Sequence, residues 1–340
     1  MTQKLSPIYG SDPNGLVWGY RFSPCQPGQP ITAEEGLELL SSPEFARQRE
    51  FIWLHFSLSN SASELWLKRN LALPESFYES LHTDIRSTRL EQDGDSLVAV
   101  IYDVLFDFKF DASDISTASL FIESQLLISA RLRPLRSVDE LRVSVRSEKV
   151  FQSTVALLAH LFEKQAGVLV NILRHSTSLV DKIEDRLLAN RIAVSRTELG
   201  SIRRVLVRLQ RLLAPEPAAL FRLLNQPPEW IVDDDIQALQ QIGEEFSAVV
   251  GDTTTLIERV KLLQEELSAL VNERTNNTLY VLTVVTVLAL PINLVGSLFG
   301  MNVGGIPLTN NEHGFLIIVE IMLSLTVFLG YMALGRKRDI

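Results

Sequence analysis

The amino-acid sequence predicts an α+β domain, followed by long helices and two C-terminal membrane-spanning helices. The first 145 residues contain short runs rich in β-branched and aromatic residues, whereas helical periodicity dominates from about residue 146. Near the C-terminus no Asp, Glu, Lys or Arg occurs from Thr275 to Asn311, and a second apolar run follows. Because roughly 20 apolar residues in a helix can cross a bilayer, this uncharged region predicts membrane insertion.

Length, charge and cysteine content limit the class of protein. The chain has 340 residues, enough for two or three domains, and a formal net charge of −9, which argues against a nucleic-acid partner. The single cysteine, Cys25, cannot form an intrachain disulfide and is typical of a reducing compartment. The segment Met1–Gly15 lacks the apolar core of a signal peptide. We therefore expect the bulk of the chain to be cytoplasmic.

Residues 1–145 are expected to form an α/β cytoplasmic domain. The dipeptide Asp93-Gly94 between two apolar runs predicts a hairpin turn. The expected helices are Ala33–Leu40, Ser61–Asn70 and Pro74–Leu81. The expected strands are Leu16–Phe22, Phe51–Leu58, Ser87–Leu90, Leu97–Phe106, Ser119–Glu123 and Gln125–Arg131.

Residues 146–277 are expected to form long cytoplasmic helices, including the stalk of a pore helix. Apolar residues at helical spacing predict one helix over Val150–Asn190 and another over Arg196–Leu213. Four prolines between positions 215 and 228 indicate the connection that follows these helices.

A single very long helix is expected to enter the membrane. No proline occurs between Pro228 and Pro291, and three aspartates from Asp233 onward favour a helix start. A helix from there to Phe299 would have about 67 residues and, at 1.5 Å per residue, a length of about 100 Å.

The two membrane spans are expected at residues 278–299 and 314–335, joined by an external loop at 300–313. The tail 336–340 contains Arg336, Lys337 and Arg338, while the loop has no Lys or Arg. The positive-inside rule then places both termini in the cytoplasm and the chain in the inner (plasma) membrane. The alternative is a buried helical hairpin in a soluble protein.

The long helix carries two stripes of different character. Its cytoplasmic part has a coiled-coil-like seam, at Leu256, Val260, Leu263, Leu267 and Leu270. Its membrane part has a mainly polar stripe, at Asn276, Leu279, Thr283, Thr286, Leu290, Asn293 and Ser297. A polar stripe on a membrane helix must face protein or water, so several copies are expected to meet around a pore. Continuing the stripe into the cytoplasm reaches Glu265 and Glu258.

Two alternatives remain open for these residues. Threonine in a membrane helix often donates to the carbonyl four residues earlier, which would satisfy Thr283 and Thr286 within their own helix. Glu258 and Glu265 could belong to an ordinary solvated face.

The membrane region resembles the CorA superfamily of divalent-cation transport proteins. The segment from Leu282 to Pro291, followed by Gly300-Met301-Asn302 and a second span, carries the resemblance, and Gly304-Gly305-Ile306-Pro307 is similar to the zinc-transporting ZntB branch.

The resemblance implies a funnel-shaped homopentamer in which the first span lines a central pore. Gly300, Met301 and Asn302 would then form the outer mouth, with Asn302 holding a hydrated cation. The pore would be lined by Asn293, Leu290, Thr286, Thr283, Leu279 and Asn276, and continued by the cytoplasmic acids Glu265 and Glu258. No cofactor other than the transported cation is implied.

Two departures from the family pattern concern acidic residues. Magnesium-transporting members carry an acid soon after the signature, whereas this chain has Glu312 and His313 later in the loop, which are zinc ligand types. Glu320 lies within the second span, where we expect it to be protonated and bonded to a neighbouring helix, or to take part in proton coupling.

These observations favour Zn²⁺ transport through a pentameric pore. The nearest alternative is a Mg²⁺/Co²⁺/Ni²⁺ channel gated by cytoplasmic metal, and a non-conducting membrane scaffold is a third hypothesis. An enzyme is not expected, because no nucleophile arrangement or phosphate-binding loop is visible.

Overall fold

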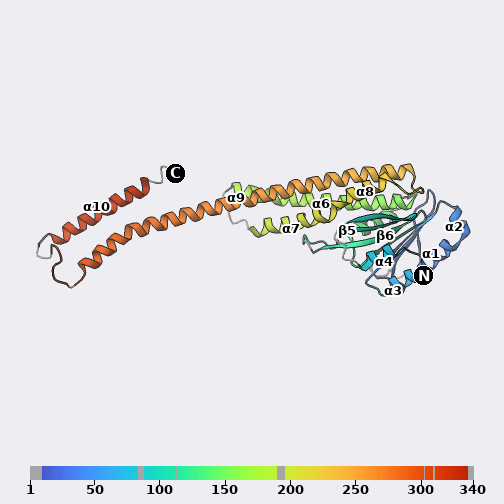
Figure 1. Ribbon diagram of the computed structural model, residues 1–340, viewed down its shortest axis with the longest axis horizontal. Coiled ribbons are helices and arrows are strands. Elements are labelled where there is room, and N and C mark those ends of the chain that lie inside the picture. Colours follow the sequence, from blue (N-terminus) through green and yellow to red (C-terminus); the bar gives the residue numbers. More distant parts are fainter. Residues whose placement is uncertain are drawn as a thin grey trace. The chain divides into compact units, whose positions relative to one another are not determined.

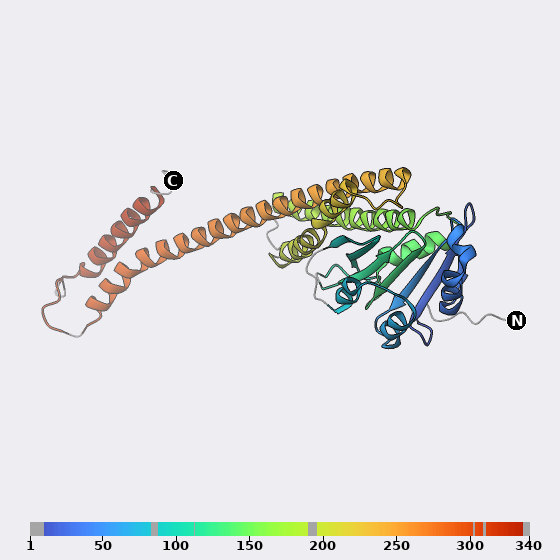
Figure 2. The ribbon, with the colours of Figure 1, turned by 45° about the vertical axis from the view of Figure 1, so that its right-hand side comes forward.

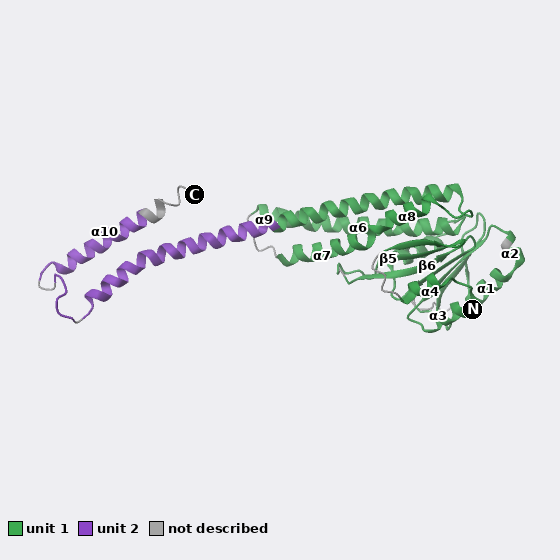
Figure 3. Ribbon diagram, in the orientation of Figure 1, with its two compact units in different colours: residues 1–264 green, residues 265–340 purple. Residues whose placement is uncertain are grey.

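The computed structural model describes residues 10–82, 88–111, 113–189, 196–301, 303–308 and 311–335. It contains two compact units, unit 1 over Met1–Gln264 and unit 2 over Glu265–Ile340 (Figure 3). The predicted fold class is confirmed, with an α/β part, long helices and two apolar C-terminal helices. Two sequence predictions, the roles of Asn302 and of the basic tail 336–340, concern residues outside the described ranges.

Unit 1 is built on a seven-stranded sheet in the order β2-β1-β3-β7-β6-β5-β4. Only β3 and β7 pair in parallel. Asp93 pairs with Ser96, and Gly94 has φ +62°, which confirms the predicted hairpin with a two-residue loop. The strands are β1 (Leu16–Phe22), β2 (Gln29–Ile31), β3 (Phe51–Ser57), β4 (Arg89–Asp93), β5 (Ser96–Val104), β6 (Ile115–Ile122) and β7 (Leu126–Arg131).

Helices cover both faces of this sheet, so β3 and β5 are buried along their whole length. Side chains alternate between the faces, as the pleat requires. Trp53 and Ile101 share one core with Phe162 of α6 (Thr154–Leu188), which crosses that face in Figure 2. Leu54 and Phe121 pack with Phe77 in a second core. The second core includes residues of four short helices, α1 (Ala33–Ser41), α2 (Pro43–Arg47), α3 (Ala62–Asn70) and α4 (Glu75–His82).

The helix α6 is long and apolar enough to span a membrane, yet it is a core helix. About two thirds of its most apolar window, 67%, is buried inside the chain. The side-chain hydroxyl of Ser153 caps its start by accepting from the Ala156 amide at 2.8 Å. Hydropathy therefore marks three helices, of which α6 is explained by packing within unit 1.

The proline-rich segment after α7 (Arg196–Leu213) is largely helical, which corrects the prediction of a simple connection. Pro215 is the first residue of α8 (Pro215–Asn225), and Pro217 lies in its first turn. Amide groups in a first helical turn have no intrahelical acceptor, so proline costs little there. The sequence interpretation also missed β2, α2 and α5 (Arg136–Arg146).

The two C-terminal helices have the predicted extents. The helix α9 (Asp233–Phe299) has 67 residues and contains Pro291, and its ribbon is continuous in Figure 1. It is followed by α10 (Gly314–Gly335). The most apolar window of α9 is 0% buried and that of α10 is 6% buried. Such exposed apolar surface on two helices is suited to a bilayer rather than to water.

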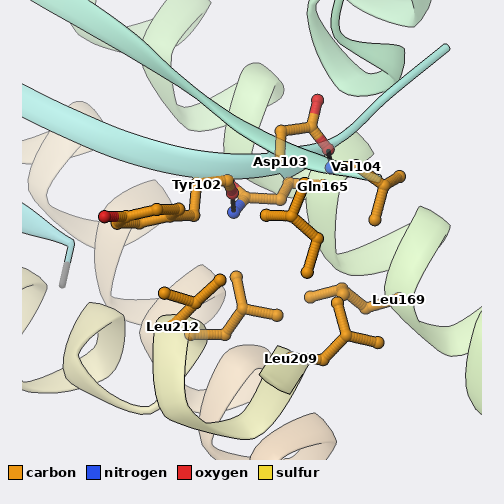
Figure 4. A pocket seen from close by; sticks show the side chains of 9 residues that line it. Tyr102, Asp103, Val104, Gln165, Leu169, Leu209 and Leu212 are labelled. Carbon is orange, nitrogen blue, oxygen red and sulfur yellow. Dashed lines mark hydrogen bonds between the residues drawn. The ribbon is translucent and has the colours of Figure 1, made fainter. Parts of the chain in front are cut away.

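The buried acidic side chains of unit 1 include Glu216 and Asp103. Glu216 of α8 accepts hydrogen bonds from Thr88 Oγ1 at 3.0 Å and Gln165 Nε2 at 2.8 Å, and burial raises its pKa to about 8. Burial also raises the pKa of Asp103 to about 6, although Ser137 and the Val104 amide donate to it. An adjacent cavity has a volume of about 10 Å³. Figure 4 shows Gln165 on one side of this cavity and Leu209 on the other.

We expect Glu216→Gln to make unit 1 less sensitive to rising pH. Because the folded-state pKa of about 8 exceeds the ordinary 4.5, the folded state binds more protons between these values. The wild-type carboxyl therefore makes its full contribution to the free energy of unfolding below pH 4.5. This contribution, on the order of a few kcal/mol, is lost as pH rises towards 8.

Tryptophan fluorescence during thermal unfolding checks this expectation, because all four tryptophans lie in unit 1. Wild type should lose more stability than Glu216→Gln between pH 5 and pH 8. The exposed Glu229→Gln provides the control and should follow wild type. Equal slopes for all three proteins would contradict a neutral Glu216.

Candidate functional site

The cytoplasmic part of α9 is fixed to unit 1 by one face. Leu256, Val260 and Leu263 of the predicted seam are buried. Beside them Arg259 forms ion pairs with Asp181, at 2.8 Å, and with Glu184 of α6. The seam is therefore a packing surface, as its periodicity indicates.

The polar stripe lies on the opposite side of the same helix. At 100° per residue, the stripe is displaced from the seam by about 150°. Every member of the stripe is exposed in the single chain, namely Asn276, Leu279, Thr283, Thr286, Leu290, Asn293 and Ser297. The structure thus brings all predicted pore-lining residues onto one uncovered face.

Within unit 2, α10 lies against a different face of α9. The half-buried residues of the α9 span form a third stripe, displaced from the polar one by about 150°. This stripe comprises Val284, Leu288, Pro291 and Val295. Leu288 Cδ2 would be 4.0 Å from a Cβ placed on Gly330 of α10. One copy of α10 therefore leaves the polar stripe without a cover.

The threonines of the stripe are satisfied by their own helix, which confirms the alternative interpretation of their hydroxyl protons. Thr283 Oγ1 donates to the Leu279 carbonyl and Thr286 Oγ1 to the Leu282 carbonyl, both at 2.8 Å. Each hydroxyl oxygen keeps lone pairs that point away from this bond. In the described part of the chain, the side chains of Asn276 and Asn293 have no hydrogen-bond partner.

The two acids that continue the stripe are both exposed, but they differ in their surroundings. Lys261 Nζ lies 3.7 Å from a carboxylate oxygen of Glu258. Lys261 falls on the same side of the helix, a neighbour that the sequence analysis missed although its spacing shows it. Glu265 forms no ion pair with any residue in the described ranges. The positive charge of Lys261 therefore offsets one of the two acids.

The loop between the spans depends on two glycines. Gly305 has φ +96°, a conformation that side chains disfavour. A Cβ on Gly314 would come within 2.5 Å of the Leu308 carbonyl oxygen. At the end of α9 the Gly300 amide bonds the Gly296 carbonyl at 3.0 Å, and Met301 is exposed. The conformation of Gly305 and the close approach of Leu308 to Gly314 therefore define the turn that leads into α10.

The remaining polar groups near the spans are also exposed in one chain. Glu312 and His313 lie at the start of α10, where the His313 amide donates to Asn311 Oδ1 at 3.0 Å. Glu320 lies six residues into α10 and has no hydrogen bond to the described residues. Among the residues that the structure describes, no group of three or more His, Cys, Asp or Glu side chains is placed to hold a metal ion.

The family follows from comparison with known proteins. The sequence model of the CorA-like Mg²⁺ transporter protein family matches residues 48–336, most of the chain. The chain belongs to this family. The family consists of transporters of divalent cations rather than enzymes.

Similar proteins share the whole architecture. The divalent cation transporter CmaX of Pseudomonas aeruginosa is 27% identical over 308 residues, covering 89% of this chain and 91% of CmaX. The zinc transport protein ZntB of Pectobacterium carotovorum is 24% identical over 309 residues, covering 91% of this chain and 93% of ZntB. The solved CorA magnesium transporter of Methanocaldococcus jannaschii is 19% identical with a TM-score of 0.73, covering 92% and 96%. Full-length CmaX gives a TM-score of 0.79 at 23% identity, covering 95% and 99%.

We expect Gly314→Ala to disturb the loop of this CorA-family chain, whereas Gly304→Ala should not. The added methyl group at 314 would meet the Leu308 carbonyl oxygen, while nothing lies within 4 Å of a Cβ at 304. Thermal stability in detergent, followed by size-exclusion chromatography, provides the measurement. Equal stability of the two variants would contradict the close approach of Leu308 to Gly314.

Proposed function

We propose that this CorA-family chain is one subunit of a homopentamer that transports divalent cations, with Zn²⁺ as its preferred ion. The observation that supports it most directly is the uncovered polar stripe of α9. Asparagine side chains are costly to expose to hydrocarbon, and the single α10 helix packs elsewhere. Copies of α9 that meet around an axis would place the stripe against water.

Such a pore would offer the ion weak, neutral ligands. Rings of Asn276 and Asn293 amides, with the threonine oxygens between them, can accept hydrogen bonds from the water shell of a cation. Weak rings let the ion leave as well as enter. Rings of Leu279 and Leu290 would form apolar constrictions that close the pore by dewetting.

We propose that the two ends of the pore differ in charge. The outer mouth would consist of Gly300, Met301 and Asn302, with Asn302 holding the hydrated cation. At the cytoplasmic end, Glu265 would raise the local cation concentration more than Glu258, because Lys261 lies next to Glu258. The membrane would be the inner (plasma) membrane, with both termini cytoplasmic and the domain limits as given from the sequence.

The preference for Zn²⁺ rests on three observations. ZntB relatives align over nearly the whole chain. The loop after Met301 has no acid before Glu312. Glu312 and His313 are exposed and of zinc-ligand type. The second candidate is a Mg²⁺/Co²⁺/Ni²⁺ channel gated by cytoplasmic metal, favoured by the family match and by the likeness to the archaeal magnesium transporter.

Reconstitution in liposomes with Zn²⁺ and Mg²⁺ indicators tests the proposal. We expect Asn293→Leu to reduce flux at least tenfold, because it replaces a polar ring with an apolar constriction. Ile292→Leu is the matched control, since its side chain lies about 100° away on the helix, and it should conduct like wild type. Absence of flux for every divalent ion in wild type would exclude both candidates and leave the scaffold hypothesis.

We further expect Glu320→Gln to abolish stimulation of Zn²⁺ uptake by a pH gradient, while uptake without a gradient remains. Glutamine keeps the size of the side chain but cannot exchange a proton. The measurement is Zn²⁺ flux in the same liposomes at equal and at unequal pH. Unchanged stimulation in Glu320→Gln would show that this carboxyl only bonds a neighbouring helix.

A further inference from the structure

A polar cleft of unit 1 lies far along the chain from the membrane spans. It has a volume of about 570 Å³ and is formed by α7, the end of α4 and the start of β6. Its polar lining includes Arg208, Arg211, His82, Ser116 and Thr117. Small-molecule sites are typically concave and have volumes of about 300–1,000 Å³. The cleft has the size of a site for a small molecule.

The charge of this cleft is opposite to that of the protein. The chain has a net charge of −9, yet the described residues of the lining include two arginines and no Asp or Glu. Arg208 and Arg211 are three residues apart on α7, so their side chains emerge from the same side of the helix. In the described ranges neither forms an ion pair. Two guanidinium groups therefore face solvent without compensation.

The other arginines of α7 lie in different surroundings. Arg203 Nη1 donates to Gln264 of α9 at 3.2 Å. Arg204 acts electrostatically on Asp111, and it lowers the pKa of that carboxyl, although less than the Ser113 hydrogen bonds do. Neither Arg203 nor Arg204 lines the cleft, so Arg208 and Arg211 are the arginines of α7 that the described lining includes.

The cleft wall also supplies hydroxyl groups. Ser119 Oγ donates to the Ser80 carbonyl at 3.2 Å, and Ser80 Oγ donates to the Phe77 carbonyl at 2.6 Å, so these two hydroxyl protons are engaged. Thr117 is half-buried and pairs with Tyr102, another lining residue, so its hydroxyl lies on the cleft face of β6 and has no side-chain partner among the described residues. Ser116 pairs with Asp103 and points to the other face of the sheet.

The arginines emerge from a helix that is firmly held. Leu209 and Leu212 on the inner face of α7 are buried, and Thr88 Oγ1 donates to the Leu212 carbonyl at 3.2 Å. A fixed helix limits the entropy lost when the two guanidinium groups bind a ligand. Guanidinium and hydroxyl donors together match the oxygens of phosphate.

We propose that this cleft binds the phosphate groups of a small phosphorylated metabolite of nucleotide size. Arg208 and Arg211 contact the phosphate oxygens, and Thr117 donates a hydrogen bond from the strand. A planar membrane surface is a poorer fit, because the site is a concave cleft. The site belongs to unit 1 and does not depend on the proposed ion selectivity.

Calorimetric titration of the full-length protein in detergent tests the site, with sodium pyrophosphate and ATP as probes in the presence of EDTA. We expect wild type to bind both, and the double variant Arg208→Gln/Arg211→Gln to bind at least tenfold more weakly. Arg203→Gln, which removes one charge from the same helix outside the cleft lining, is the control and should bind like wild type. Tryptophan fluorescence shows whether each variant is folded.

Three results would overturn the proposal. In the first, wild type binds neither probe at about 1 mM, a dissociation constant that corresponds to a binding free energy of roughly −4 kcal/mol. Alternatively, the double variant would bind like wild type, or the Arg203→Gln control would lose as much affinity as the double variant, which indicates a non-specific effect of charge. If the double variant changes the oligomeric state but not pyrophosphate binding, the cleft is a contact between copies of the chain.

Discussion

The membrane half of this protein depends on one constraint, which is that polar groups in an apolar medium need hydrogen-bond partners. The span of α9 carries asparagine and threonine side chains on one face, and α10 packs on another. A single chain therefore has its polar stripe exposed where a bilayer would surround it. The stripe needs further copies of α9 or water, and a pore supplies both. In this view the chain oligomerises because the side chains of its polar stripe need hydrogen-bond partners.

The long helix separates two tasks on opposite faces. In unit 1 the seam of Leu256, Val260 and Leu263 is buried, and Arg259 joins it to α6 through two carboxylates. Glu258, from which the polar stripe continues towards the membrane, projects about 160° away from the seam. The face that packs on unit 1 is thus separate from the face that would line the proposed pore.

Local periodicity explains what could be predicted from the sequence. The bounds of β1 and α7, the Asp93-Gly94 hairpin and the uninterrupted α9 follow from alternation, helical spacing and turn chemistry. The prolines of α8 were misinterpreted because position within a helix, and not proline content, decides their cost. Sequence alone could not show that Glu216 meets Gln165 and Thr88, or that Arg208 and Arg211 face β6, because residues far apart in the chain form these contacts. Lys261, by contrast, was visible from its spacing to Glu258.

The threonine hydroxyls donate to carbonyls of their own helix, and this is compatible with the proposal that the same residues line a pore. Thr283 and Thr286 give their hydroxyl protons to carbonyls of their own helix, so their oxygens can act outward only as acceptors. An anion needs donors, and these two groups have none left to offer. A cation with its water shell needs acceptors, which the same oxygens still provide. In the proposed pore, these intrahelical hydrogen bonds would remove the donors from both positions and favour cations over anions there.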